Sequence, residues 1–278
     1  MKKFATYFFS LLVPGLILLN IEYNGYSLPL LLNKAKEVFF LVNKSKKKLD
    51  TKTLLLGDSV CKQLFAEKKN AATYCLCNNQ SYEIPGNFIL LKNLIEANSS
   101  FDKVILIINP TTLTMSLNQE YTFNYFIKPF GNDLKLLDKE EVDYINKTFP
   151  NYTAFSWLPV VKHSFSNWDI GNEDSFDDFK NSTVSATNIK YLKKIIALCE
   201  KHGIEFQVKS PPAKKSTKAY VDKVRSTLKE SDAKTNRIFS NYFKSIIYFD
   251  DEYFQDGIHF SKSRFDKNDY PEIDALIN

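Results

Sequence analysis

The sequence predicts an α/β protein built on a parallel sheet with helices on both of its faces. Short apolar runs alternate along the chain with segments of helical periodicity, as parallel strands do with the helices that connect them. The runs are continuously apolar rather than alternating, which is typical of strands buried on both faces. Several polar residues with reactive side chains follow the ends of these runs.

Five runs are expected to form the strands of this sheet. The run 103–108 is rich in β-branched residues, which favour strands. The run 204–208 is closed by Ser210-Pro211-Pro212, and proline cannot donate to a sheet. The predicted strands are residues 51–56, 73–77, 103–108, 204–208 and 245–249.

Helices are expected between these strands. Residues 186–202 have helical periodicity and end at Gly203, a residue suited to the left-handed conformation that closes a helix. Gly86 stands just ahead of the second predicted helix. The predicted helices are residues 60–69, 88–96, 186–202 and 215–231.

A long insertion, residues 111–185, follows the third strand. A stretch of this length inside a compact domain is usually functional, for example a lid or a binding wall. Its aromatic faces would suit sugar rings or an acyl chain. The alternative is that most of them pack the insertion onto the body. These aromatic residues include Tyr121, Phe123, Tyr125, Phe126, Phe130, Phe149, Tyr152, Phe155, Trp157, Phe165 and Trp168.

The positive charge of the chain is confined to its N-terminal part. The first 50 residues carry eight lysines against three acidic residues, which accounts for the whole net charge of +5. The rest of the chain is balanced, so nothing in it predicts a nucleic-acid partner.

Residues 1–22 are expected to be an uncleaved signal-anchor that crosses a membrane. Lys2 and Lys3 precede an apolar stretch, and no small residues suited to cleavage follow it. The apolar stretch is near the short end for a membrane span. A cleaved signal peptide and a buried N-terminal helix are the alternatives. Residues 23–50 read either as a basic helix lying on the membrane surface or as a solvated linker.

The remaining residues, 51–278, are expected to form one domain that contains the insertion. Its four cysteines are expected to be small core residues, with a disulfide as an alternative if the domain is exported. Their spacing does not match that of a zinc site, and neither a metal nor a cofactor is predicted. The cysteines are Cys61, Cys75, Cys77 and Cys199.

Two short motifs carry the chemistry that the sequence predicts. One is Gly57-Asp58-Ser59, directly after the first predicted strand, and the other runs from Asp256 to His259 near the C-terminus. Together they supply a nucleophile, a general base and an orienting carboxylate. The alternative for the first motif is an ordinary helix cap, and for the second an exposed loop histidine.

The position of His259 favours the catalytic interpretation. Of the three histidines, His202 lies at a helix end and His163 lies in the insertion. Only His259 follows a predicted strand with an acid at a suitable spacing. Ser59 and Asn109 also follow predicted strand ends, and ligands of parallel sheets lie beyond those ends.

These residues resemble the motifs of the SGNH (GDSL-like) hydrolase superfamily. Gly57-Asp58-Ser59 matches its first sequence block, and Asp256 and His259 match its last. The resemblance covers about residues 51–265 and implies a flavodoxin-like three-layer α/β/α fold. It also implies an oxyanion hole formed by the backbone N–H groups of Ser59 and a glycine and by an asparagine side chain.

Gly86 and Asn109 are the residues that match the glycine and the asparagine of that oxyanion hole. Only the asparagine of the third block, Gly-x-Asn-Asp, is present, because its neighbours here are Ile107, Ile108 and Pro110. The alternative oxyanion contacts are Asn78, Asn79 and Gln80.

The resemblance implies a serine esterase, and together with the N-terminal segment it predicts a membrane-anchored protein whose catalytic domain faces the periplasm or the cell surface. Its expected substrates are O-acetylated envelope glycans, other acylated carbohydrates or other small esters. Two alternatives remain open: a polysaccharide O-acyltransferase, and a non-catalytic glycan-binding or envelope-assembly protein that keeps the fold.

Overall fold

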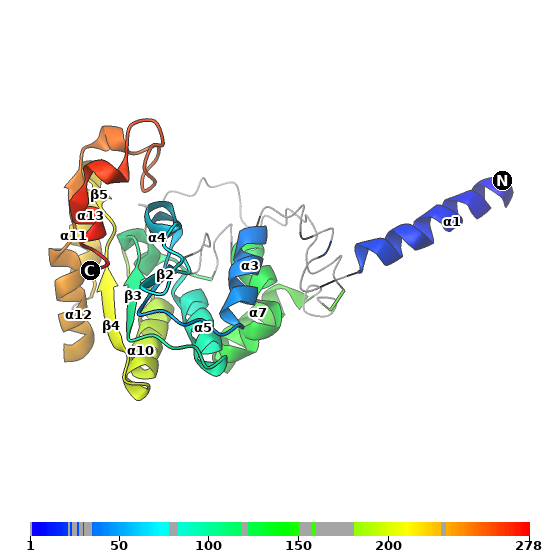
Figure 1. The fold of residues 1–278 in the computed structure, drawn as a ribbon, viewed down its shortest axis with the longest axis horizontal. Coiled ribbons are helices and arrows are strands. Elements are labelled where there is room, and N and C mark those ends of the chain that lie inside the picture. The colour runs from blue at the N-terminus through cyan, green and yellow to red at the C-terminus, as the bar shows by residue number, and fades with distance from the viewer. Residues whose placement is uncertain are drawn as a thin grey trace.

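A computed structural model of the chain describes residues 2–21, 23, 27, 30, 35–77, 83–117, 122–150, 157–158, 181–228 and 232–278. Figure 1 shows a central sheet with helices packed against it and helix α1 (Lys2–Leu19) projecting away from the body.

A four-stranded parallel sheet with the order β2-β1-β3-β4 forms the centre of the molecule. The predicted α/β class and parallel sheet are therefore confirmed. Leu54 and Leu56 of β1 face one core with Val104 of β3, whereas Leu55 and Ile105 face the other. The strands of this sheet are β1 (Thr53–Gly57), β2 (Thr73–Cys75), β3 (Lys103–Ile107) and β4 (Glu205–Lys209).

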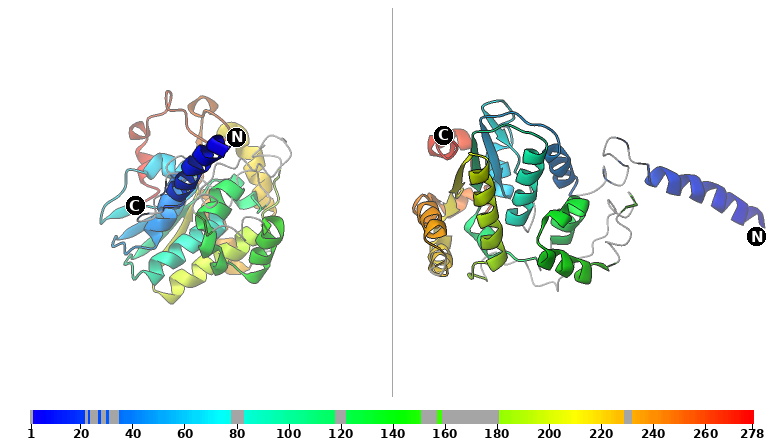
Figure 2. Two further views of the ribbon diagram at one scale, coloured as in Figure 1. Left: turned by 90° about the vertical axis from the view of Figure 1, so that its right-hand side faces the viewer. Right: turned by 90° about the horizontal axis from the view of Figure 1, so that it is seen from below.

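Helices cover both faces of the sheet, which gives three layers (Figures 1 and 2). Helices α5 (Glu83–Glu96) and α10 (Ala186–Lys201) pack against each other on one face. Helix α4 (Ser59–Phe65) and the C-terminal segment, with α13 (Pro271–Asp274), cover the other. The predicted helix end at Gly203 is confirmed, because this residue has a positive φ of 68° just beyond α10.

The predicted fifth strand differs from the structure. Strand β6 (Tyr248–Phe249) pairs in parallel with β5 (Ala213–Lys214) in a separate two-stranded sheet. Pro211 and Pro212 follow β4 and cannot donate ladder hydrogen bonds, so the chain turns away before it pairs again.

Three helices have other bounds than the sequence predicts. Helix α5 begins five residues earlier than expected, because proline is tolerated in a first helical turn and Pro85 lies there. Helix α4 ends at Phe65 rather than at residue 69. The predicted helix 215–231 is a short 3₁₀ turn, η4 (Lys215–Thr217), followed by α11 (Lys218–Ser226). Helix α12 (Ala233–Lys244) was not expected from the sequence.

The described part of the insertion is mostly helical and packs on the body. Phe123, Phe126, Phe130 and Phe149 are buried in the main core, so for these four the packing alternative is confirmed. Trp157 is exposed. Tyr121, Tyr152, Phe155, Phe165 and Trp168 lie outside the described residues. The helical pieces are η1 (Pro110–Thr114), η2 (Phe123–Ile127), α6 (Lys128–Phe130), η3 (Gly131–Leu136) and α7 (Lys139–Thr148).

The N-terminal part contains two described helices. Helix α3 (Lys36–Ser45) buries Val38, Phe39 and Val42 against the body, in contact with α5 and α6, so this apolar face is covered by protein. Helix α1 projects away from the body (Figure 2), and many of its large apolar side chains are exposed. No helix among the described residues has the length and apolarity needed to cross a membrane. Two 3₁₀ turns, η5 (Asp251–Tyr253) and η6 (Lys267–Asp269), complete the C-terminal part.

Candidate active site

Gly57 ends β1 at a point where only glycine fits. A Cβ atom on this residue would lie 2.0 Å from the carbonyl oxygen of Ile107 and 2.8 Å from the Cβ of Cys61. Both are far inside van der Waals contact, so any side chain would push β1 away from β3 or from α4. The glycine of the first motif is therefore a requirement of packing.

Ser59 is the first residue of α4, and Asp58 caps that helix. The Asp58 carboxylate accepts hydrogen bonds from the N–H groups of Val60 (2.9 Å) and Cys61 (3.2 Å). The N–H of Ser59 has no acceptor within the described part of the chain. At a helix N-terminus such a group is oriented to stabilise negative charge.

Ser59, His259 and Asp256 form a continuous chain of hydrogen bonds. The Ser59 Oγ lies 2.8 Å from Nε2 of His259, and Nδ1 of His259 lies 2.9 Å from Oδ2 of Asp256. The structure thus brings together the nucleophile, base and acid that the sequence predicts, across 200 residues of chain. The His259 side chain is 30% exposed, so a solvent-borne molecule can reach it.

Asp256 is held in its orientation by the backbone of its own turn. Its Oδ1 accepts the N–H groups of Ile258 (2.8 Å) and His259 (2.7 Å). Partial burial alone would raise the pKa of the Asp256 carboxyl. The hydrogen bonds from these N–H groups and the nearby imidazole outweigh that effect and lower the pKa below its usual value. The carboxylate is therefore ionised at neutral pH and holds a proton on Nδ1 of His259.

Asp58 is buried behind the site and links two strand ends. Its Oδ2 accepts the N–H of Asn109 (2.5 Å) and the hydroxyl of Thr112 (3.0 Å), in addition to the cap of α4. Burial raises the pKa of Asp58 although all four hydrogen bonds oppose the rise. Because its oxygens point inward, Asp58 is a structural carboxylate. For this residue, the helix-cap alternative is confirmed.

Asn109 lies directly beyond β3, beside the end of β1. Its Oδ1 accepts the N–H and the hydroxyl of Thr111, both at 3.1 Å, which fixes the side-chain amide. Its Nδ2 donates to no acceptor within the described residues. Asn188 of α10 holds the same loop, because its Nδ2 contacts the carbonyl oxygens of Thr112, Leu113 and Met115 at 2.8 to 3.3 Å.

Gly86 lies inside the first turn of α5, and the prediction that it stands ahead of a helix is wrong. The neighbouring Asn87 is fully buried, and neither polar atom of its amide has a hydrogen-bond partner among the described residues. Asn78, Asn79 and Gln80 lie outside the described residues.

An aromatic stack supports the loop that carries His259. The ring of Phe260 is fully buried and stacks on Phe265 (centroids 3.9 Å apart) and on Phe254 (4.7 Å). Phe265 in turn stacks on Tyr270 (5.3 Å). The packing of these rings on one another fixes the backbone beside His259.

The cysteines next to the site depart in part from expectation. Cys61, in the first turn of α4, forms a disulfide with Cys77, two residues beyond β2, with Cα atoms 5.9 Å apart. Cys75 and Cys199 are buried thiols, as predicted. The sulfur atoms of Cys61, Cys75 and Cys77 lie within 4.8 Å of one another. Because two of them are bonded to each other, this group offers a metal only the Cys75 sulfur in this state.

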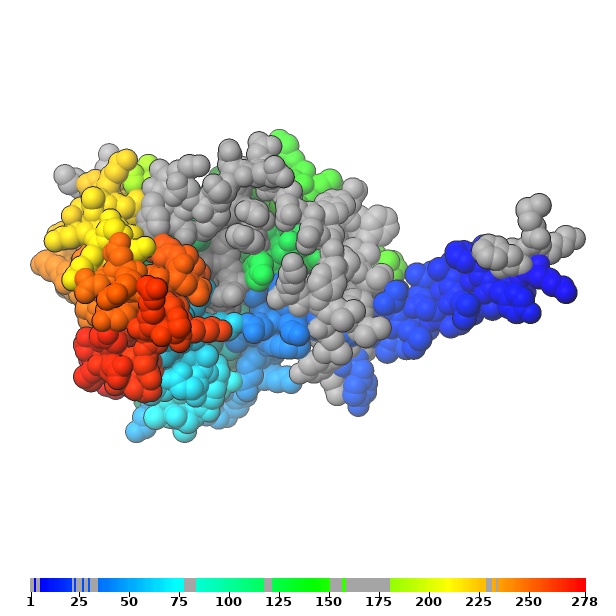
Figure 3. Space-filling view, turned by 90° about the horizontal axis from the view of Figure 1, so that it is seen from above, coloured from blue at the N-terminus to red at the C-terminus, as the bar shows by residue number. Residues whose placement is uncertain are grey.

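The site occupies the point of the sheet where the strand order reverses. Strands β1 and β3 are neighbours, and Ser59 and Asn109 follow their carboxyl ends, where α/β proteins bind ligands. Figure 3 views this side and shows the C-terminal segment beside the residues that follow β1. Ser210, after β4, is buried and donates to the carbonyl of Pro211, and no hydrogen bond between the described residues joins it to the triad.

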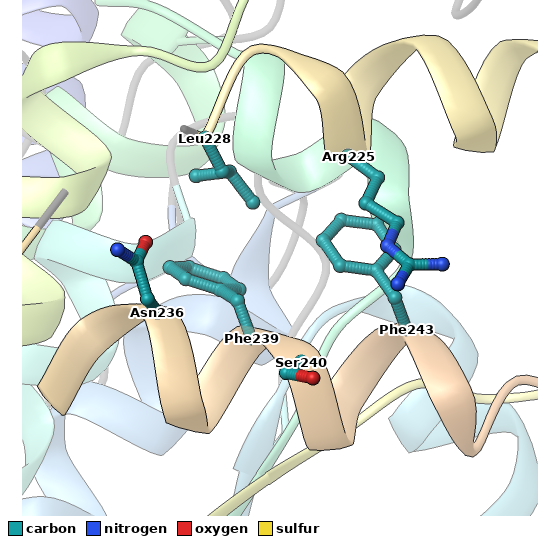
Figure 4. Close-up of a pocket in the computed structure, with 6 residues that line it drawn as sticks. All are labelled: Arg225, Leu228, Asn236, Phe239, Ser240 and Phe243. Atoms are coloured by element: carbon teal, nitrogen blue, oxygen red, sulfur yellow. The ribbon is translucent and has the colours of Figure 1, made fainter. Parts of the chain in front are cut away.

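A separate pocket of about 290 Å³ lies between α11 and α12 (Figure 4). Phe239 and Phe243 form one wall, and Arg225 extends over it from α11. None of the triad residues lines it. The lining residues are Arg225, Leu228, Asn236, Phe239, Ser240 and Phe243.

Residues that support the triad were not predicted from the sequence. Thr112, Asn188 and Gln63 all make long-range hydrogen bonds at the site. Only Gln63 had a signal along the chain: it lies four residues after Ser59 in a predicted helix and therefore on the same helical face.

No protein-family model, no curated protein and no solved structure matches this chain.

Proposed function

We propose that the protein is a serine acyl-transfer enzyme, an esterase that uses Ser59 as its nucleophile. The observation that carries the proposal is the hydrogen-bonded chain from Ser59 through His259 to Asp256. Two donors that have no acceptor in the described part of the chain, the Ser59 N–H and the Asn109 Nδ2, lie at the ends of neighbouring strands and support it.

In the first step, the Ser59 oxygen attacks the carbonyl carbon of an ester while its proton passes to Nε2 of His259. The Asp256 carboxylate stabilises the imidazolium through Nδ1–H. The Ser59 N–H and the Asn109 amide are the proposed donors to the oxyanion, and Gly86 stays a predicted third donor. The imidazolium then gives its proton to the departing alcohol, which leaves an acyl group on Ser59.

In the second step, an acceptor hydroxyl gives its proton to Nε2 of His259 and attacks the acyl carbon. The Ser59 oxygen leaves and recovers the proton from the imidazolium. If the acceptor is water, the reaction is ester hydrolysis. If it is a sugar hydroxyl, the same residues perform O-acyl transfer.

We further propose that the chain is a member of the SGNH superfamily with a flavodoxin-like fold. The sheet order, with a site where that order reverses, supports this assignment. The proposed substrates are O-acetylated glycans of the cell envelope or other small esters. The exposed Trp157 of the insertion supports a carbohydrate, because an indole face can pack on a sugar ring.

The proposed location is outside the cytoplasm, with residues 1–22 as the membrane anchor and residues 51–278 as the catalytic domain. The disulfide between Cys61 and Cys77 supports an oxidising compartment. The exposed apolar side chains of α1, behind Lys2 and Lys3, support contact with lipid.

Hydrolysis of p-nitrophenyl acetate by the full chain in mild detergent tests the proposed chemistry. We expect turnover that falls to the uncatalysed background in Ser59→Ala. The matched control is Ser263→Ala, because Ser263 is an exposed serine whose hydroxyl is hydrogen-bonded to that of Ser261, away from the triad. The control should keep full activity. Equal turnover in Ser59→Ala and the wild type, or none in the folded wild type, would overturn the proposal.

A further inference from the structure

The loop that carries His259 must hold the imidazole within hydrogen-bond distance of a serine on another element. Residues 255–261 belong to no described helix or strand, apart from a single bridge between Phe254 and Phe260. The hydrogen bonds of Asp256 and the aromatic stack order this loop internally. The apolar residues of this loop also share a hydrophobic core with α4, where Ser59 lies, but apolar packing is not directional, so a precise position of the loop on α4 needs a polar connection as well.

Gln63 makes that connection. Its Nε2 donates to the carbonyl oxygen of Phe260 (2.7 Å), and its Oε1 accepts the N–H of Phe260 (3.0 Å). The side-chain amide thus pairs with the backbone as a neighbouring strand would, using one donor and one acceptor. Phe260 directly follows His259, so these hydrogen bonds fix the backbone next to the imidazole.

Gln63 and Ser59 are four residues apart on α4 and therefore share one helical face. The nucleophile and the support of the base are carried by the same rigid turn of helix. A movement of α4 would shift both together and preserve the 2.8 Å contact between Ser59 and His259.

We propose that Gln63 is a positioning residue for the reaction: it docks the His259 loop onto the helix of the nucleophile. This inference rests on the proposed function. Gln63 is itself exposed, so replacing it creates no cavity. The loss of its hydrogen bonds affects catalysis through the placement of His259 more than it affects folding.

The test compares Gln63→Met with Lys267→Met in the full chain. Methionine has the length of glutamine but makes neither hydrogen bond. Lys267 also ties the C-terminal segment to the end of α4 that is far from Ser59, through the carbonyl oxygen of Leu64 (2.9 Å) and the carboxylate of Glu67 just beyond the helix. Lys267→Met is therefore the matched control, because it removes contacts that dock the C-terminal segment but none beside the imidazole.

For Gln63→Met we expect kcat to fall about 10²-fold, the effect of a misplacement of about 1 Å, with KM and the melting temperature nearly unchanged. Lys267→Met should lower the melting temperature and leave kcat unchanged. Wild-type kcat in Gln63→Met, or a loss of kcat in Lys267→Met as large as in Gln63→Met, would overturn the inference.

A second measurement separates this inference from the proposed function. Nitrogen NMR of the histidine rings, with His259 assigned by His259→Gln, reports which ring nitrogen carries the proton. We expect a proton on Nδ1 in both proteins, because Asp256 belongs to the same loop as His259, and a shifted Nε2 resonance in Gln63→Met, because the hydrogen bond between Ser59 and Nε2 is weakened. An unchanged Nε2 resonance in Gln63→Met would contradict the positioning role. An inactive wild type, with the Nε2 shift seen in Gln63→Met, would refute the proposed function alone.

Discussion

Asp58 and Ser59 are neighbours in the chain, yet their side chains point to opposite sides of the turn. The Asp58 carboxylate is directed inward and binds the N–H of Asn109 and the cap of α4. The Ser59 hydroxyl is directed to His259. The acid of the first motif thus aligns two strand ends, and the serine hydroxyl stays available to His259.

Replacement of Asn109 tests the proposed oxyanion donor. Loss of one such donor typically lowers kcat by about 10²–10³-fold. We therefore expect Asn109→Ala to keep weak activity, well above that of Ser59→Ala. Steady-state hydrolysis of p-nitrophenyl acetate measures both.

Asn109→Asp is the sharper variant of this test. Aspartate keeps the Oδ1 that accepts from Thr111 but loses the Nδ2 donor and adds negative charge beside the oxyanion. It should lower kcat at least as much as alanine does. Full activity in Asn109→Asp would exclude Nδ2 as an oxyanion donor.

Asp256→Asn tests the carboxylate that orients His259. An amide in place of the carboxylate favours the wrong tautomer of the imidazole, and we expect kcat to fall by about 10⁴-fold. Ser59→Ala is the reference for complete loss. An Asp256→Asn variant within tenfold of the wild type would show that Asp256 does not orient the base.

The lowered pKa of Asp256 also sets the pH at which this residue contributes to stability. Its contribution is fully present above the pKa of an unfolded aspartate, about 4, and is lost as pH falls through the lower folded value. Thermal melts from pH 7 to pH 2 should show a loss below about pH 4 that is smaller in Asp256→Asn. The same acid loss in both proteins would contradict this expectation.

The triad residues could be predicted because each lies in a short motif at a predicted strand end. The order of the predicted strands and helices was enough to place Ser59, Asp256 and His259 on one edge of a sheet. Gln63 and Asn188 could not be predicted in the same way. Their partners lie 197 and up to 76 residues away, and amide side chains of this kind are common on any helix.

At the level of elements, the apolar runs of β1 and β3 were predicted within two residues of their bounds. The pairing of short strands was not predicted, because the two residues of β6 are too few to show a sequence pattern that identifies the partner strand. The start of α5 was missed because Pro85 and Gly86 suggest a break, although both are tolerated in a first turn. Helix α12 had a signal in the spacing of Phe239, Tyr242 and Phe243.

The disulfide ties α4 to the segment after β2 and closes a short loop. Its sequence separation of 16 corresponds to about 3 kcal/mol in the free energy of unfolding. We expect Cys77→Ala to lose about 2–4 kcal/mol, measured by urea unfolding of the full chain. The control is Cys199→Ala, which removes a buried thiol but no cross-link. Equal losses in the two variants, or no effect of a reductant on the wild type, would contradict this role.

At the level of the whole molecule, the site joins the two ends of the domain. The chain leaves β1 at Ser59 and passes through the sheet, the insertion and α10 before it returns with His259. Helix α3 packs on α5 and covers part of the hydrophobic core that α5 and α10 form on one face of the sheet. A shortened chain that lacks α1 should therefore retain α3 and begin before Lys36.

The most direct test of the central claim is covalent labelling of the full chain by a fluorophosphonate probe, followed by mapping of the modified peptide. The triad predicts a single phosphonylated serine, Ser59, with labelling abolished in Ser59→Ala and strongly slowed in a folded His259→Gln. Labelling at another serine, or no labelling of a folded wild-type chain, would contradict the assignment of Ser59 as an activated nucleophile.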